Sequence, residues 1–298
     1  MYLRHFALRE APFSITPDSA FFFPHDSAPA ALNTLLVALR GGEGFLKIVG
    51  EVGCGKTVLC RQLLRTLQDE CVTAYIPNPD MGSDDLLHAL CHELAVPMPQ
   101  SARRHRLLNA LKDCLIKHAL EGQRVVVLID EAQAIPLATV ESLRLLSNLE
   151  TEKRKLLQLV LLGQPELDAK LALPQIRQLL QRITFSDYLG PMRASQVAPY
   201  LVHRLAVAAA SEATDTQVFL PQAAADIAQC SAGVPRLVNL LAHKCLLLAY
   251  GENTHRVTPT HVQLAAADTQ GLMTKPARGR RGPRWWWPTW PWGKGEVS

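Results

Sequence analysis

Residues 50–57 of this 298-residue chain read Gly-Glu-Val-Gly-Cys-Gly-Lys-Thr, a complete G-x-x-x-x-G-K-[ST] phosphate-binding loop. Before the loop, the apolar run 45–49 predicts a buried strand; after it, the apolar spacing over 58–67 predicts a helix. The motif requires this context, because its glycines let backbone N–H groups approach phosphate oxygens at a helix N-terminus. A glycine turn that merely precedes a lysine would not explain both flanks. The sequence therefore predicts binding of a nucleoside triphosphate.

The residues of the loop have separate expected roles. The Lys56 side chain would reach the β- and γ-phosphates, and the Thr57 hydroxyl would ligate Mg²⁺. Cys54 would stand beside the phosphates and a lysine, so its thiol is a candidate for sensitivity to oxidants. The full set expected to contact ATP is Gly50, Glu51, Val52, Gly53, Cys54, Gly55, Lys56, Thr57 and Val58.

A second motif follows downstream, where five apolar residues, 125–129, run into Asp130 and Glu131. This is the form of a Walker B strand in a parallel sheet that is covered on both faces. Asp130 would hold Mg²⁺ through water, and Glu131 would orient and polarise the attacking water. The alternative is a capped strand before an acidic turn. The phosphate loop upstream, with one predicted strand between, favours the catalytic interpretation and an ATP hydrolase over a passive nucleotide binder.

Three other stretches predict strands: 71–78, 156–163 and a short one after 179–185. Gln164 comes just past the second of these, level with the γ-phosphate, and is a candidate sensor; alone it would be a turn residue. Helices are predicted over 30–40, 84–94, 101–118 and 137–150. His88, Cys91 and His92 have a spacing that zinc accepts, but no further ligand cluster completes such a site, which favours surface or boundary positions.

The pattern divides the chain into four parts. Residues 1–40 are aromatic and proline-rich, and we expect them to pack on the core, with one or two aromatic rings lining the base pocket. Residues 41–190 form the nucleotide-binding α/β core. Residues 191–270 form a separate helical domain, with helices over 194–209, 221–230, 235–250 and 259–268, and Arg236 stands at the start of the third. Residues 271–298 form a tail that we expect to be disordered.

Charge and cysteine content narrow the function classes. The formal net charge is +4, but six basic residues against Glu296 give the tail +5, which leaves the body at −1. A nucleic-acid-coating body is therefore not indicated. The seven cysteines form no C-x-x-C pair and are typical of reduced core thiols. The N-terminus does not have the pattern of a signal peptide, and no apolar run is long enough to span a bilayer, so we expect a cytoplasmic protein.

All five tryptophans lie in the tail, after a cluster of arginines. Arginine followed by tryptophan suits the headgroup region of an anionic membrane, so membrane or membrane-protein contact is the favoured interpretation. Stacking on single-stranded nucleic acid, docking on a partner protein, and no role at all stay open as alternatives.

The order of these features resembles that of the AAA+ ATPases: phosphate loop, interposed strand, Asp-Glu strand, sensor strand, and helical lid with an arginine. Four stretches, 42–53, 143–151, 163–167 and 233–239, are similar to the secretion-ATPase family that includes ExeA/GspA, and the opening 5–18 resembles that family's start. The resemblance covers about residues 1–270. It implies a five-stranded parallel sheet of order 5-1-4-3-2 with a helical lid.

The resemblance also implies roles for three more residues. Gln164 matches the sensor 1 position and Arg236 matches sensor 2 on the lid. Arg182 matches the arginine that AAA+ proteins insert into a neighbouring subunit's site, with Arg177 as a weaker candidate. Such an arginine would stabilise charge on the γ-phosphoryl oxygens, so hydrolysis would depend on a homo-oligomer. Cys54 departs from the family pattern, which has threonine there.

The longer secretion members of the family carry a transmembrane helix and a peptidoglycan-binding domain, whereas these 298 residues match the shorter, pilus-associated type. We therefore expect a cytoplasmic ATPase, peripheral at the inner membrane, that uses ATP and Mg²⁺. It would act on inner-membrane assembly proteins of a type IV pilus-like (MSHA) or type II secretion-like apparatus. Two alternatives stay open: a nucleic-acid-associated AAA+ ATPase of the transposition or initiator kind, and a nucleotide-switch scaffold with little turnover.

Overall fold

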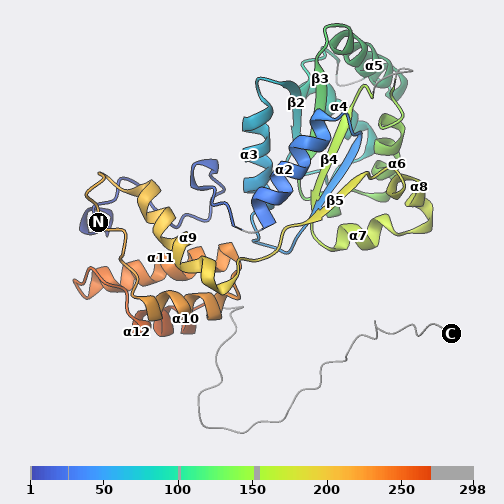
Figure 1. Ribbon diagram of the computed structural model, residues 1–298. Coiled ribbons are helices and arrows are strands. Elements are labelled where there is room, and N and C mark those ends of the chain that lie inside the picture. Colours follow the sequence, from blue (N-terminus) through green and yellow to red (C-terminus); the bar gives the residue numbers. More distant parts are fainter. Residues whose placement is uncertain (1, 26, 100–101, 151–154, 270–298) are drawn as a thin grey trace, which may run out of the picture.

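The computed structural model describes residues 2–25, 27–99, 102–150 and 155–269 (Figure 1). Its centre is one parallel sheet in the order β2-β3-β4-β1-β5. The strands are β1 (Phe45–Val49), β2 (Cys71–Ile76), β3 (Arg124–Ile129), β4 (Gln158–Gly163) and β5 (Phe185–Tyr188). This confirms the predicted five-stranded order 5-1-4-3-2. The Trp-rich tail lies outside the described residues, so the predictions made for it stay predictions.

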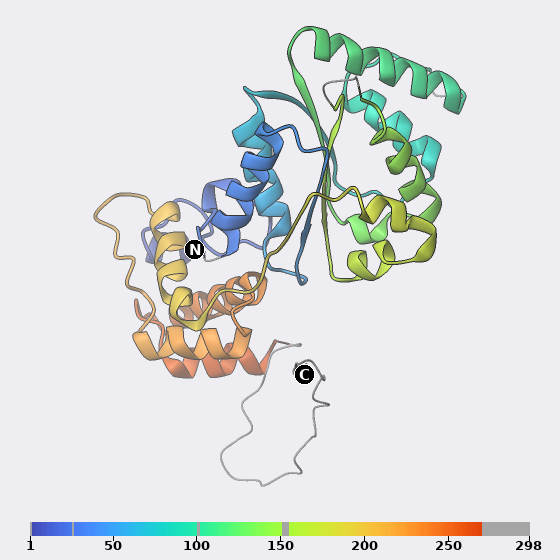
Figure 2. The same cartoon turned by 45° about the vertical axis from the view of Figure 1, so that its right-hand side comes forward.

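Side chains of the central strands alternate between two apolar layers. Leu46 and Ile48 of β1 join a cluster with α2 (Ser27–Arg40) and α3 (Lys56–Leu67) on one face. Phe45 and Val49 point to the other face, covered by α4 (Ser83–Glu93), α5 (Arg104–Leu120), α6 (Leu137–Leu146), α7 (Glu166–Leu171) and α8 (Arg177–Leu180). Figure 2 shows the helices on both sides of the sheet. Burial on both faces explains why these strands read as continuous apolar runs.

Three predicted helices have an end that differs by three or more residues, among them 30–40, which begins at Ser27. The suggested zinc ligands do not converge. The predicted helix 101–118 begins at Arg104, and 137–150 ends at Leu146, where the backbone N–H of Ser147 still bonds to the Leu143 carbonyl. On α4, Cys91 is buried in the core whereas the His92 ring is exposed. These two side chains therefore face different environments.

The lid is a bundle of α9 (Ala194–Ala208), α10 (Pro221–Ser231), α11 (Pro235–Gly251) and α12 (Pro259–Ala267). Its apolar cluster includes Phe6, Leu8, Phe13 and Phe21 from the N-terminal segment, which begins with α1 (Tyr2–His5). Figure 1 shows this segment beside α9 and α11. No helix among the described residues combines the length and hydropathy required to cross a membrane.

The expectation that residues 1–40 pack on the core is thus correct for α2 and for Phe22, which lies against the same apolar cluster. The other phenylalanine side chains before α2, Phe6, Phe13, Phe21 and Phe23, pack among the lid helices instead. Backbone hydrogen bonds fasten the two together, from Arg9 N to the Ala208 carbonyl and from Ala210 N to the Ala7 carbonyl. The physical reason is that the lid, a small bundle, exposes an apolar surface that these rings cover.

Candidate functional site

The phosphate loop lies between β1 and α3, and its glycines are sterically required. Gly53 and Gly55 have φ of +82° and +95°, a region that residues with a Cβ atom rarely adopt. A Cβ atom on Gly50 would stand 2.4 Å from the Leu189 carbonyl oxygen. Helix α3 begins at Lys56, so its free N–H groups face the space enclosed by the loop. The loop thus has the form of an anion cradle.

The side chains of Lys56 and Thr57 are already engaged. Lys56 Nζ donates to the carbonyl oxygens of Gly50 at 2.6 Å and Glu51 at 3.0 Å. The Thr57 hydroxyl donates to Asp130 Oδ2 at 2.7 Å. The structure therefore brings the two predicted Mg²⁺ ligands together, and a hydroxyl beside a carboxylate is the donor set that Mg²⁺ prefers.

Asp130 is 2% exposed at the carboxyl end of β3. Burial raises the pKa of its carboxyl group, and hydrogen bonds from Thr57 and from the Glu131 backbone N–H offset only part of this rise. The carboxylate is therefore held at an electrostatic cost in the absence of a cation. A divalent cation at this place would remove that cost.

Glu131 and Gln164 are also side by side, although they come from different strands. Gln164 Nε2 donates to Glu131 Oε2 at 3.0 Å, and Gln133 Nε2 donates to the same oxygen at 2.5 Å. Glu131 has a left-handed backbone, with φ of +48°. Glu131 and Gln164 both line the cavity that contains the phosphate loop, together with Lys56 and Thr57. The predicted base and sensor thus face the predicted phosphate site.

The lid reaches the phosphate loop through the turn before α11. The backbone N–H of Arg236 donates to the Gly53 carbonyl at 3.2 Å, and a Cβ atom on Gly53 would stand 2.8 Å from the Arg236 Cβ. Gly233, with φ of +74°, lies against Met192, where a Cβ atom would be 1.9 Å from the carbonyl oxygen. These close contacts place the exposed Arg236 side chain over the loop.

The far end of the cavity contains residues that the sequence analysis missed. Arg204 of α9 is 6% exposed; it donates to the Pro12 carbonyl and to the Tyr200 hydroxyl at 3.0 Å, and it lies 4.5 Å from the centre of the Phe21 ring. The Tyr200 hydroxyl donates in turn to Asn239 Oδ1 at 2.8 Å. The residues that line this end are Ser14, Ile15, Thr16, Pro17, Asp18, Phe21, Phe22, Phe23, Tyr200, Arg204 and Asn239.

No local pattern distinguishes Arg204 from an ordinary arginine on an amphipathic helix, so only the fold reveals its position. The density of aromatic residues within 1–40 suggested that one or two rings would line a base pocket. Phe21, Phe22 and Phe23 all line the cavity; Phe21 and Phe23 pack with the lid helices, whereas Phe22 packs on the core.

Cys54, the candidate for oxidant sensitivity, does not have the environment of a reactive thiol. Its side chain has no exposed surface, and burial raises the pKa of the thiol despite the nearby Lys56. Reactive thiols require an exposed sulfur and a lowered pKa, and Cys54 has neither.

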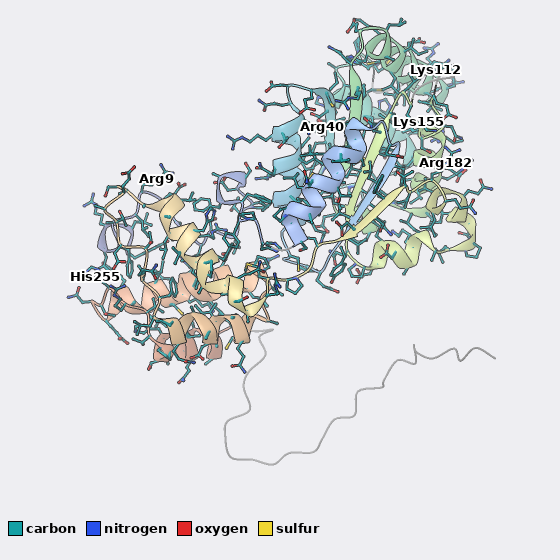
Figure 3. All side chains as sticks on the ribbon, in the orientation of Figure 1. Arg9, Arg40, Lys112, Lys155, Arg182 and His255 are labelled. Carbon is teal, nitrogen blue, oxygen red and sulfur yellow. The ribbon has the colours of Figure 1, made fainter. Side chains whose placement is uncertain are left out.

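Arg182 lies away from the cavity of its own chain. Arg182 comes just before the start of β5, and its Nη1 atom lies 3.3 Å from the Ser147 carbonyl oxygen. The parallel register of β5 with β1 sets that start beside Leu46, whereas the phosphate loop follows the other end of β1. Figure 3 shows Arg182 on the side of the sheet remote from the lid. Arg177 begins α8, which precedes β5 on the same side.

Comparison with known proteins agrees with this geometry. Residues 39–171 match the family model described as AAA domain. Over 272 residues, 91% of this chain, the sequence is 40% identical to General secretion pathway protein A of Aeromonas hydrophila. The chain spans about half of that relative, 49% of its length.

Solved structures support the fold. Cdc6p from Pyrobaculum aerophilum superposes with a TM-score of 0.67 at 18% identity, covering 85% of this chain and 69% of that one. The ORC2 protein of Aeropyrum pernix gives 0.63 at 16% identity, covering 87% and 73%. The RuvB branch migration motor of Thermotoga maritima gives 0.53 at 18% identity, covering 80% and 67%. The chain therefore shares the α/β fold of these solved structures, its residues 39–171 match the AAA domain model, and it is similar along most of its length to General secretion pathway protein A.

Proposed function

We propose that this chain is an AAA+ ATPase that couples ATP binding and hydrolysis to the assembly of a secretion or pilus apparatus at the inner membrane. The convergence of Lys56, the Thr57–Asp130 pair and the Glu131–Gln164 pair on one cavity supports the enzymatic part. The likeness to General secretion pathway protein A supports a role related to secretion.

The residues at the phosphate site have separate roles in this proposal. Loop 50–58 holds the phosphates through backbone N–H groups, and Lys56 exchanges its two carbonyl partners for phosphate oxygens. Thr57 and Asp130 hold Mg²⁺, which neutralises the charge that develops on the phosphates. Glu131 orients water and accepts its proton, and Gln164 donates to the γ-phosphate. Arg236 adds a cation from the lid.

The proposal gives Arg182 a partner site in a second subunit. Its place at the start of β5 puts it out of reach of its own phosphate loop, so it serves only a neighbour's. A cation supplied in this way stabilises the transition state of phosphoryl transfer. Hydrolysis then requires a homo-oligomer.

The first test is ATP turnover per subunit as the protein concentration rises, with Glu131→Gln as the blank. A steep rise is the expected result, because sites are completed only on assembly. A flat, appreciable rate would show that each subunit hydrolyses alone, and the assignment of Arg182 would be wrong. No rate above the blank, also in the presence of partner proteins, would leave a nucleotide switch.

Mixing two inactive variants tests the same assignment directly. The Arg182→Ala variant still has Glu131, and the Glu131→Gln variant still has Arg182. In a mixed oligomer, a site with Glu131 from the first variant and Arg182 from a neighbouring subunit of the second is therefore complete. We expect turnover to return on mixing, whereas each variant alone stays near the blank. Arg106→Ala, an exposed arginine on α5, is the matched control and should be as active as the wild type.

We further propose that the chain acts from the cytoplasmic face of the inner membrane, in the manner of the shorter pilus-associated type represented by the MSHA-pilus protein MshM. The Arg-then-Trp order of the tail supports contact with an anionic membrane. Deletion of residues 275–298 should abolish co-sedimentation with anionic liposomes. Unchanged sedimentation would contradict this part of the proposal.

A further inference from the structure

The Glu131 carboxylate is held through one of its two oxygens. Among the described residues, both hydrogen bonds to this carboxylate end on Oε2, from Gln133 Nε2 at 2.5 Å and from Gln164 Nε2 at 3.0 Å. The lone pairs of Oε1 are therefore left for another donor, and Glu131 faces the cavity. A water molecule in the cavity is such a donor.

Gln133 links this carboxylate to the neighbouring strand. Its Oε1 atom accepts a hydrogen bond from the Gln164 backbone N–H at 2.9 Å, while its Nε2 atom donates to Glu131. Because a side-chain amide is planar, the two bonds fix the angle between the carboxylate and the end of β4. Gln133 is not among the described residues that line the cavity, so it acts from behind Glu131.

The backbone around Gln133 is itself held in place. It lies in the short 3-10 turn Ala132–Ala134, which follows the left-handed Glu131. Lys170 of α7 donates to the carbonyl oxygens of Gln133 and Ile135, the latter at 2.6 Å. Gly163 lies against the amide, since a Cβ atom there would stand 3.2 Å from Gln133 Oε1. Such support from several elements is what a preorganised site requires.

We infer that Gln133 is a positioning residue for hydrolysis, which holds the Glu131 carboxylate in one orientation with Oε1 left for the attacking water. The inference rests on the proposed function, in which Glu131 activates that water. Gln164 shares the same carboxylate oxygen, so its amide leaves Glu131 when it turns to the γ-phosphate. Gln133 is then the donor that keeps Glu131 oriented during the reaction.

The test is the steady-state kinetics of Gln133→Met, which has a similar length but neither hydrogen bond. We expect kcat for ATP to fall about 10- to 100-fold, the cost typical of losing the support of a catalytic group, with KM and the thermal midpoint unchanged. Gln133→Glu should lose at least as much, because it places a second carboxylate against Glu131. Gln263→Met, an exposed glutamine on α12, is the control and should match the wild type.

Four outcomes would overturn the inference. A kcat within twofold of wild type would show that Gln133 does not orient the base, and an increased kcat would show that it restrains it. A raised KM with unchanged kcat would show a contact with ATP itself. If Gln133→Met unfolds, Gln133→Glu decides between the same outcomes. A wild type no faster than Glu131→Gln rejects the proposed function and this inference together, whereas an active wild type beside an unaffected Gln133→Met rejects the inference alone.

Discussion

The two walls of the cavity are built in different ways. The core wall uses residues 52–58, Glu131 and Gln164, and its polar side chains contact one another and the supporting Asp130 and Gln133 behind them. The lid wall combines parts from distant segments: residues 14–23 from the N-terminus, Tyr200 and Arg204 from α9, and Arg236 from α11. Their partners include backbone carbonyls and aromatic rings, as the contacts of Arg204 show.

This difference indicates that the two walls have different roles. The core wall holds buried charge at an electrostatic cost, as at Asp130, so its residues serve chemistry more than stability. The lid wall buries aromatic surface and holds Arg204 and Tyr200 in hydrogen bonds, so its residues decide whether the cavity is closed and whether the lid is stable. Changes in the core wall should therefore alter turnover, and changes in the lid wall should alter affinity and unfolding.

The largest effect is expected from Asp130→Asn. The loss of the carboxylate that holds Mg²⁺ should lower ATP turnover about 100-fold or more. Since burial raises the pKa of Asp130, a neutral side chain of the same shape should not lower the thermal midpoint. ATP turnover is measured at several Mg²⁺ concentrations, and a melting curve gives the thermal midpoint. A marked loss of stability would remove the contrast between the walls.

Gly233→Ala should act on the lid. The new Cβ atom would meet the Met192 carbonyl oxygen at 1.9 Å on a backbone with φ of +74°, so the free energy of unfolding should fall by about 1–3 kcal/mol or more. Chemical denaturation measures this. Gly251→Ala at the end of α11 is the matched control, because nothing lies within 4 Å of its new Cβ atom. Equal stability of the two variants would contradict the tight packing at the turn.

Arg204→Met should release the N-terminal segment from α9. It removes the hydrogen bonds to the Pro12 carbonyl and the Tyr200 hydroxyl, and nucleotide affinity should fall about 10-fold with little change in kcat at saturation. Titration with a fluorescent ATP analogue gives the affinity. Arg256→Met removes an exposed lid cation paired with Asp215 and should change little. A fall in kcat alone would place Arg204 with the chemistry instead.

The smallest expected effect is on the loss of stability at acidic pH. Burial lowers the pKa of His203, helped by the neighbouring Arg204, although a backbone hydrogen bond at Phe22 opposes this; burial likewise lowers the pKa of His243. Below pH ~6.5, the ordinary pKa of histidine, both side chains bind fewer protons in the folded protein than in the unfolded chain. The stability they contribute is therefore complete above that pH and is lost as the pH falls through the lowered folded values. Unfolding midpoints between pH 7.5 and about 5 should fall less in a His203→Gln, His243→Gln double variant.

Prediction from the sequence succeeded where one local pattern is sufficient. The resemblance to the AAA+ ATPases implied the strand order, and the phosphate-loop and Walker B motifs assigned Thr57 and Asp130 to one metal ion. Gln133 was within reach of such reasoning, since it lies three residues after Asp130 and is polar in an otherwise apolar turn. Its double contact with Glu131 and Gln164, however, depends on the left-handed backbone at Glu131.

The sequence was insufficient where a local pattern fits more than one packing environment. Phe13 and Phe21 are apolar enough for either the sheet or the lid, and their burial among the lid helices depended on which surface lacked a cover. Cys54 has a cation nearby in sequence, but the packing of α2 and the sheet around it buries the sulfur and decides its pKa.

The sequence by itself determined the parallel sheet, the phosphate loop and the pair of carboxylates, because hydrophobic period and glycine placement act over neighbouring residues. Only the tertiary structure decided that an N-terminal segment and a lid arginine close the far end of the cavity, and that Arg182 lies away from it. Those arrangements join residues about 190 positions apart, as in the bond from Arg204 to the Pro12 carbonyl. Contacts over such distances are selected by the shape and burial of whole surfaces, which no local pattern encodes.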